Sequence, residues 1–163
     1  MRQFLKSNRI WLTLILVLVI MIIIFLMSAQ PANESLQTSG GFVEFAERIF
    51  FPDMDSMSPA EMEALHENVT NIVRKIGHFC EYGALGFFTL LHIDAISFRR
   101  KIHRKPLWAL LVSFLYSCSD EIHQAFVPGR GPGVRDVLID TSGALAGILV
   151  MTFILYLVRK KHG

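Results

Sequence analysis

The feature that most constrains this chain is an apolar run from Ile10 to Met27 that contains no charged residue. A helix needs about 20 mostly apolar residues to cross the hydrocarbon core of a bilayer. Basic residues precede the run and Ser28-Ala29 follows it, as in a signal peptide. However, the run is longer than the roughly 7–15 apolar residues of a cleaved signal. We therefore expect a retained membrane anchor.

Three further apolar runs follow, from about Gly77 to Phe98, Pro106 to Ala125 and Val137 to Val158. A segment inside the hydrocarbon must satisfy its own backbone polar groups, so each run is expected to be a helix. Hydrophobic residues make up 52% of the 163 residues, which is above the usual range for soluble domains. The sequence predicts a single all-α membrane domain over 1–163, with four transmembrane helices at about 10–27, 77–98, 106–125 and 137–158.

The basic residues form three clusters: before the first run, between the second and third runs, and after the fourth. They are Arg2, Lys6 and Arg9, then Arg99, Arg100, Lys101, Arg104 and Lys105, then Arg159, Lys160 and Lys161. Segment 28–76 is acidic instead. Because positive charge marks the cytoplasmic side, both termini are predicted to be cytoplasmic. The polar residues on that side are expected to be solvated or structural: His92, Asp94, His103 and His162.

Segment 28–76 is predicted to be extracytoplasmic and partly helical. Phe42, Phe45 and Ile49 recur at helical spacing, which indicates an amphipathic helix. Two placements suit it equally: in the membrane interface, or packed on the outer end of the bundle. Ser58-Pro59-Ala60-Glu61 has the composition of a helix start, and an apolar stripe follows it. We expect this second helix to continue directly into the span that begins near Gly77.

Polar residues gather at the predicted outer ends of the last three spans. Spacing places His78, Glu81 and Tyr82 on one helix face. It likewise groups Asp120 with His123 and Gln124, and Asp136 with Asp140. The candidate pocket residues are Lys75, His78, Glu81, Tyr82, Asp120, Glu121, His123, Gln124, Arg130, Arg135, Asp136 and Asp140. Gly143 and Gly147 continue the aspartate stripe and allow close helix approach, so both aspartates should face the bundle interior.

Two interpretations of this polar set are open. Arg130 or Arg135 can pair with the acids and tie helix ends together, but ionisable residues of three spans at one depth favour a functional pocket. No cofactor is required, although a divalent metal has enough oxygen and nitrogen ligands. The metal candidates are His78, Glu81, Asp120, His123, Asp136 and Asp140. Cys80 and Cys118 lie in apolar runs and are expected to be small buried side chains, with a disulfide as the alternative.

The order of these motifs resembles the VanZ-like family of bacterial membrane proteins. The matching motifs are Ser28-x-Gln30, Lys75-x-x-His78-Phe79-x-Glu81-Tyr82, Asp120-Glu121-x-His123-Gln124-x-Phe126-x-Pro128-Gly129-Arg130 and Asp136-x-x-x-Asp140-x-x-Gly143-x-x-x-Gly147. Position 140 is often asparagine in that family. The resemblance implies a multi-pass protein of the bacterial cytoplasmic membrane. It also implies a role in antibiotic resistance, since the family's namesake lowers susceptibility to teicoplanin, which acts outside that membrane.

Two functions are compatible with the sequence. The favoured one is non-enzymatic binding of a polar lipid or lipid-linked cell-wall precursor at the outer leaflet, which would modulate the response to lipoglycopeptides. Arg130 and Arg135 would then bind phosphate, while His78 and the acids bind sugar or amine groups. The alternative is a membrane-embedded, metal-dependent enzyme acting on a lipid-linked substrate. The sequence has no basic patch with interleaved aromatic residues, so a nucleic-acid partner is not expected. It also has no internal repeat or interrupted helix of the kind found in transporters.

Overall fold

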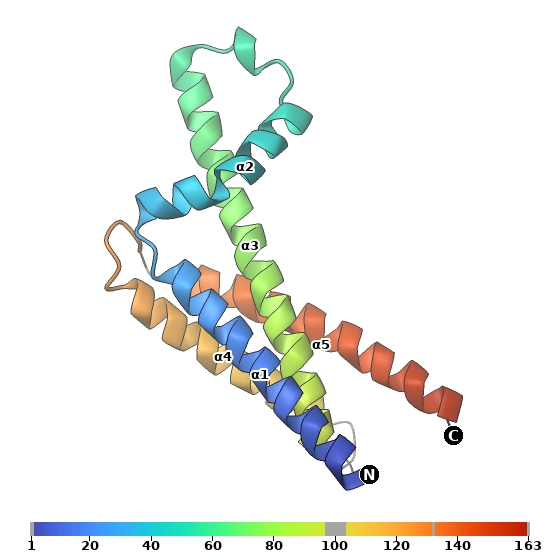
Figure 1. Cartoon of the computed structure of the whole chain (residues 1–163). Helices are drawn as coiled ribbons and strands as arrows, with labels where there is room; N and C mark the ends of the chain where they lie inside the picture. Colours follow the sequence, from blue (N-terminus) through green and yellow to red (C-terminus); the bar gives the residue numbers. More distant parts are fainter. Residues whose placement is uncertain (1, 97–103, 132, 163) are drawn as a thin grey trace.

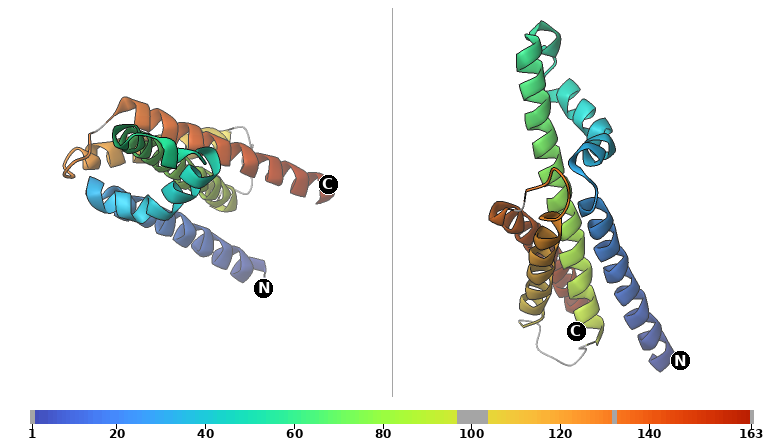
Figure 2. Two further views of the ribbon diagram at one scale, coloured as in Figure 1. Left: turned by 90° about the horizontal axis from the view of Figure 1, so that it is seen from above. Right: turned by 90° about the vertical axis from the view of Figure 1, so that its left-hand side faces the viewer.

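The computed structural model describes residues 2–96, 104–131 and 133–162, and these residues are helical apart from short connections (Figure 1). The helices are α1 (Arg2–Ser28), α2 (Ala32–Phe50), the short 3₁₀ helix η1 (Met54–Ser56), α3 (Pro59–Ile96), α4 (Lys105–Gln124) and α5 (Val134–His162). Both chain ends lie at the end of the bundle away from α2 (Figure 2). The predicted all-helical fold is confirmed.

Within the part of the chain that the structure describes, three helices, α1, α3 and α5, are long and apolar enough to cross a membrane. Helix α4 occupies the predicted third span but is more polar, because its last two turns carry Asp120, Glu121 and Gln124. It packs against α3 and α5 and touches α1. The predicted length of this helix is therefore correct to within a residue at each end, while its hydropathy sets it apart from the other three.

Helix α3 is continuous from the outer segment into the bundle, as the sequence predicts. Its start is a capping box, in which the Ser58 backbone N–H donates to Glu61 Oε2 at 2.9 Å and the Glu61 N–H lies 3.4 Å from Ser58 Oγ. The helix has 38 residues, or about 57 Å at the usual rise per residue. Since a hydrocarbon core is about 30 Å thick, the first part of α3 must project beyond it. Figure 1 shows this projecting part with α2 beside it.

Helix α2 is longer than the predicted amphipathic helix and packs against the projecting part of α3. Val43 is buried in that contact, and Glu47 Oε1 lies 2.8 Å from His66 Nδ1. Phe42, Phe45 and other apolar side chains on the rest of α2 are exposed. One face of the helix is thus held by protein, and an apolar face stays free of the chain's own residues.

The glycine stripe on α5 lies directly against α3. A methyl group added at Gly143 would overlap the Phe79 carbonyl oxygen, and one at Gly147 would overlap the Gly83 carbonyl oxygen. Only residues without a side chain allow this approach. The two backbones therefore touch, and the prediction that this stripe faces the bundle interior is confirmed.

At the end of the bundle that holds the termini, four helices meet around Asp94. Its carboxylate accepts from Lys105 Nζ at 2.8 Å and Arg159 Nη2 at 2.6 Å, and Arg9 Nη2 lies 3.9 Å away. Asp94 and Lys105 are both buried. Asp94 is therefore structural rather than solvated, and Lys105 begins α4 rather than filling a loop.

Only some of the other polar residues predicted for this end lie within the described residues. His92 Nδ1 lies 3.0 Å from Thr13 Oγ1, which links α3 to α1 and is a structural contact. His103 and the basic stretch 99–101 lie outside the described residues, as does the side chain of His162.

Candidate functional site

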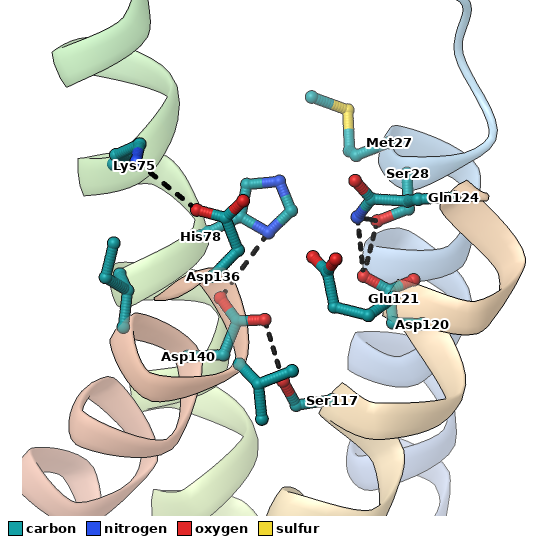
Figure 3. Close-up of polar contacts among 12 residues, drawn as sticks. Met27, Ser28, Lys75, His78, Ser117, Asp120, Glu121, Gln124, Asp136 and Asp140 are labelled. Carbon is teal, nitrogen blue, oxygen red and sulfur yellow. Dashed lines mark hydrogen bonds and ion pairs between the residues drawn. The ribbon is translucent and has the colours of Figure 1, made fainter. Parts of the chain in front are cut away.

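At the opposite end of the bundle, one or more polar side chains from each of four helices come together (Figure 3). Ser28 ends α1, His78 lies midway along α3, Asp120 is in the last turns of α4, and Asp140 is in the second turn of α5. Ser28, Asp120 and Asp140 are buried, with exposed fractions of 0%, 4% and 0%. The packing of α3 on the glycine stripe brings His78 beside Asp140.

The Asp120 carboxylate is held by neutral donors. Its Oδ2 accepts from Ser28 Oγ at 2.7 Å and from Gln124 Nε2 at 3.0 Å, and Gln124 Nε2 also reaches Ser28 Oγ at 3.2 Å. These three side chains form a closed triangle that joins α1 to α4. The hydrogen bonds orient Asp120 but supply no positive charge.

Asp140 is also held through one oxygen only. Its Oδ2 accepts from Ser117 Oγ at 2.9 Å, whereas its Oδ1 lies 3.6 Å from His78 Nδ1. That separation is too long for a hydrogen bond, and neither of these two atoms has another partner although both are buried. Buried polar atoms without partners are uncommon and costly. Ligand atoms of His78, Asp120 and Asp140 all lie within 4.8 Å of one another.

A polar cavity of about 380 Å³ opens beside this group. It is lined by Asn71, Arg74, Lys75, His78, Glu121, Gln124, Gly129, Arg130, Gly131, Asp136, Ile139 and Asp140. Lys75 Nζ lies 3.4 Å from Asp136 Oδ1 across it. Arg74 Nε is buried and has no hydrogen-bond partner. The cavity thus has a cationic donor that no protein group satisfies.

Arg130 lies on the loop between α4 and α5 and reaches back to α1. It donates from Nε to the Gln30 carbonyl at 2.9 Å and from Nη2 to the Met27 carbonyl at 3.1 Å, so it satisfies carbonyls at the end of α1. Burial, and then the like charge of Arg74, lower the pKa of the Arg130 guanidinium from its ordinary value. Two cations that repel each other across a cavity attract an anion between them.

An apolar cavity of about 560 Å³ adjoins the polar one. It lies between α2 and α3 and is lined by Met27, Ser35, Thr38, Ser39, Phe42, Phe45, Val73, Arg74, Ile76, Gly77, His78, Cys80, Glu81 and Arg130. Arg74, His78 and Arg130 line both cavities. A single ligand with a polar end and an apolar chain can therefore occupy the two together.

Other predicted site residues lie around these cavities in different roles. Glu121 lines the polar cavity and its Oε2 accepts from the Gly133 N–H at 2.7 Å. Tyr82 is fully buried, with its ring 6.2 Å from that of Tyr116 and its hydroxyl without a partner. Glu81 lines the apolar cavity and keeps Oε2 unpartnered. Arg135 is exposed and lines neither cavity.

Several sequence expectations need correction. His123 does not join the pocket, because its ring packs on that of Phe25 with centroids 4.7 Å apart. Of the six metal candidates, Glu81, His123 and Asp136 lie outside the close group. The alternative interpretation, in which Arg130 or Arg135 pairs with the acids, finds no support among the described residues, where the ion pairs at this end are Lys75–Asp136 and His78–Asp140. Cys80 and Cys118 are both free, which excludes the disulfide, and Cys80 is exposed rather than buried.

Asn71, Arg74 and Ser117 also belong to the site, although no sequence motif singled them out. Asn71 and Arg74 precede His78 by seven and four residues, so helical spacing alone places all three on one face. Ser117 precedes Asp120 by three residues and could have been found in the same way. What the spacing could not show is that Ser117 contacts Asp140 of α5 rather than its own helix.

A comparison with curated proteins and one with solved structures find no match. A family model described as VanZ/LLP1 matches residues 13–156, which include all five α-helices in whole or in large part. The match includes Ser28, the cavity residues and the glycine stripe. This protein therefore belongs to the VanZ/LLP1 family.

Proposed function

We propose that this membrane protein binds a phosphate-bearing envelope lipid, or a lipid-linked cell-wall precursor, in the outer leaflet of the bacterial cytoplasmic membrane. The observation that carries the proposal is that a polar and an apolar cavity adjoin each other and share Arg74, His78 and Arg130 in their walls. Phosphate would lie between the two arginines. Glu121 and Asp136 would accept from amine or hydroxyl groups of the ligand, and the apolar chain would lie between α2 and α3.

The proposed topology has four spans with both termini in the cytoplasm. Helix α4 counts as a span because it packs in the bundle and exposes Leu107, Trp108 and Leu115 on the side away from the other helices. Apolar side chains that are exposed in this way are matched by lipid. The basic residues near both chain ends orient that end towards the cytoplasm. This orientation places the cavities in the outer half of the membrane.

Arg74→Gln provides the test of phosphate recognition. The purified protein in mild detergent is titrated with a polyprenyl phosphate and with the corresponding polyprenol, and bound lipid is counted by native mass spectrometry. We expect the phosphate to bind at least tenfold more tightly, and Arg74→Gln to remove that preference, because a charged hydrogen bond contributes about 1.5–3 kcal/mol. Arg135→Gln is the matched control, since Arg135 lines neither cavity. Equal binding of both lipids would overturn the proposal.

The proposed consequence for the cell is a changed response to lipoglycopeptides such as teicoplanin. A precursor held in the two cavities is less accessible to a drug that acts at the outer surface. Cells that express the protein should then be less susceptible to teicoplanin than cells that express Arg74→Gln at the same level. Identical susceptibility of the two strains would separate lipid binding from any role in drug response.

A second candidate function is a metal-dependent reaction on the same lipid-linked substrate. The observation in its favour is the close approach of His78, Asp120 and Asp140 beside the polar cavity. A metal there could polarise a phosphoryl group or activate a water. Incubation of the protein with polyprenyl phosphate and Zn²⁺ or Mn²⁺ tests this candidate. Release of inorganic phosphate that Asp140→Asn abolishes would support catalysis, and unchanged lipid would leave binding as the function.

A further inference from the structure

We infer that His78, Asp120 and Asp140 form a binding site for one divalent transition-metal ion. One ligand atom from each residue lies within 4.8 Å of the other two. The three residues come from α3, α4 and α5, so the ion would join three helices beside two buried carboxylates (Figure 3).

Asp140 supplies the independent evidence for a ligand. Its side chain is 1% exposed, and its Oδ1 is aimed at His78 without a hydrogen-bond partner. A carboxylate oxygen buried in this way costs free energy unless a cation or donor meets it. His78 Nδ1 does not meet it, because 3.6 Å is beyond hydrogen-bond length. An ion between the two atoms would satisfy both.

The surrounding hydrogen bonds prepare the carboxylates for this role. Ser28 and Gln124 both donate to Oδ2 of Asp120, and Ser117 donates to Oδ2 of Asp140. Each carboxylate is thus fixed through its Oδ2, and among the described residues its Oδ1 accepts no hydrogen bond. Outer donors that orient a ligand carboxylate are a regular feature of metal sites.

The ligand set selects the class of ion. One imidazole nitrogen and two carboxylate oxygens suit Zn²⁺ or Mn²⁺, whereas Mg²⁺ prefers oxygen ligands alone and Cu⁺ prefers thiolate or thioether. Ligand atoms at about 2.0–2.1 Å from a tetrahedral ion are roughly 3.4 Å apart. The Nδ1–Oδ1 separation of 3.6 Å is close to that spacing, and the widest separation in the group, up to 4.8 Å, needs to contract by about 1.4 Å.

The ion would keep at least one coordination position open towards the polar cavity. His78 and Asp140 line that cavity, whereas Asp120 does not. Three protein ligands and an open position are typical of sites where a metal meets a substrate. A phosphate oxygen held near Arg74 and Arg130 could occupy the position. This last step rests on the proposed lipid binding, but the ion site itself does not.

The test is metal binding by the full-length protein in mild detergent, without added lipid. After treatment with a chelator, the protein is titrated with Zn²⁺ and separately with Mn²⁺ in a calorimeter, and bound metal is counted by elemental analysis after gel filtration. We expect one ion per chain and a higher Tm of the loaded protein, because a ligand that binds only the folded state stabilises it.

Asp140→Asn and His78→Gln should each weaken binding of the ion by at least tenfold, since even the loss of an outer donor weakens metal sites by this much. Glu67→Gln and His66→Gln are the matched controls, because they remove an acid and a histidine that lie outside the group and line neither cavity. Ser28→Ala, which leaves all three ligands in place, should weaken binding by a smaller factor. Full-strength binding by Asp140→Asn and His78→Gln, or no stoichiometric binding by the native protein, would overturn the inference.

The outcome is separable from the proposed function. Metal-free protein that still prefers polyprenyl phosphate would preserve lipid binding even where no ion binds. Stoichiometric Zn²⁺ or Mn²⁺ on a protein that shows no lipid preference would preserve the ion site alone.

Discussion

The two ends of the bundle each bury carboxylates, but they compensate them in opposite ways. At one end, Asp94 is contacted by Lys105, Arg159 and, at a longer distance, Arg9. At the other end, Asp120 and Asp140 have only neutral donors and the long approach of His78. At the first end lysine and arginine contact the buried acid directly, whereas at the second end, within the described residues, neither buried aspartate has an ion pair with a lysine or an arginine.

The difference indicates which end serves stability. A charge removed from water costs several kcal/mol unless close partners offset it. The Asp94 cluster meets this condition and connects all four helices of the bundle. The group of His78, Asp120 and Asp140, called the outer cluster because it lies at the end of the bundle opposite the chain ends, does not meet it, and its unpartnered atoms lie beside a cavity. Uncompensated polar groups of this kind persist where a ligand supplies the missing partner.

The strongest test of the comparison is Asp94→Asn. This change leaves the buried Lys105 ammonium and the Arg159 guanidinium without their carboxylate. Breaking a buried ion pair from one side costs about 3–5 kcal/mol. We expect a loss of that size in the free energy of unfolding, measured by denaturant titration in mixed micelles. Zn²⁺ binding by the protein that remains folded should be unchanged, and its loss would show that the two ends are coupled.

A second change tests the α3–α5 contact that positions the outer cluster. Gly147→Ala places a methyl group on the Gly83 carbonyl oxygen. The helices must separate, and overpacking of this kind costs about 1–3 kcal/mol. Gly41→Ala is the control, because nothing lies near that glycine and alanine favours the helix. We expect a lower Tm for Gly147→Ala than for Gly41→Ala. Equal Tm values for the two variants would contradict the close packing of α3 and α5.

A third change should have the opposite sign to Asp94→Asn. In Asp140→Asn, the amide keeps an oxygen for Ser117 and replaces the unpartnered Oδ1 with a nitrogen that can donate to a neutral His78. Removal of an unsatisfied buried group should raise the free energy of unfolding of the metal-free protein by about 1 kcal/mol. A loss of stability as large as that of Asp94→Asn would show that the buried carboxylates at both ends stabilise the fold.

Much of this architecture follows from local patterns. The Ser58–Glu61 capping box, the continuous α3 and the inward glycine stripe all depend on neighbours within one or two helical turns, and each was predicted correctly. The residues that line the cavity were also partly predictable, because they lie near the same end of neighbouring helices. These features are readable since helical periodicity alone determines them.

The pairings between helices could not be read from the sequence. Spacing places Asp120 and His123 on a common face, but the rotation of α4 in the bundle sends His123 to Phe25 and Asp120 to Ser28. Asp94 likewise appeared to be a solvated or structural residue until Lys105 and Arg159 were seen around it. Helix rotation and crossing are set by packing across the whole bundle, which one sequence does not display.

The smallest change in the free energy of unfolding is expected for the Lys75–Asp136 pair, which is intermediate between the two ends of the bundle. It lies at the same end as the outer cluster, yet its partners have opposite charges and keep 43% and 37% of their side-chain surface exposed. Exposed pairs typically contribute 0–1 kcal/mol, because water screens them and both side chains lose freedom. Lys75→Gln should therefore change the free energy of unfolding by less than about 1 kcal/mol. The same change removes a positive charge from the polar cavity.

A measurable weakening of polyprenyl phosphate binding at nearly constant stability would show that Lys75 contributes to ligand binding rather than to stability. The reverse result, a large loss of stability with unchanged lipid binding, would show that the Lys75–Asp136 pair stabilises the fold as the Asp94 ion pairs do.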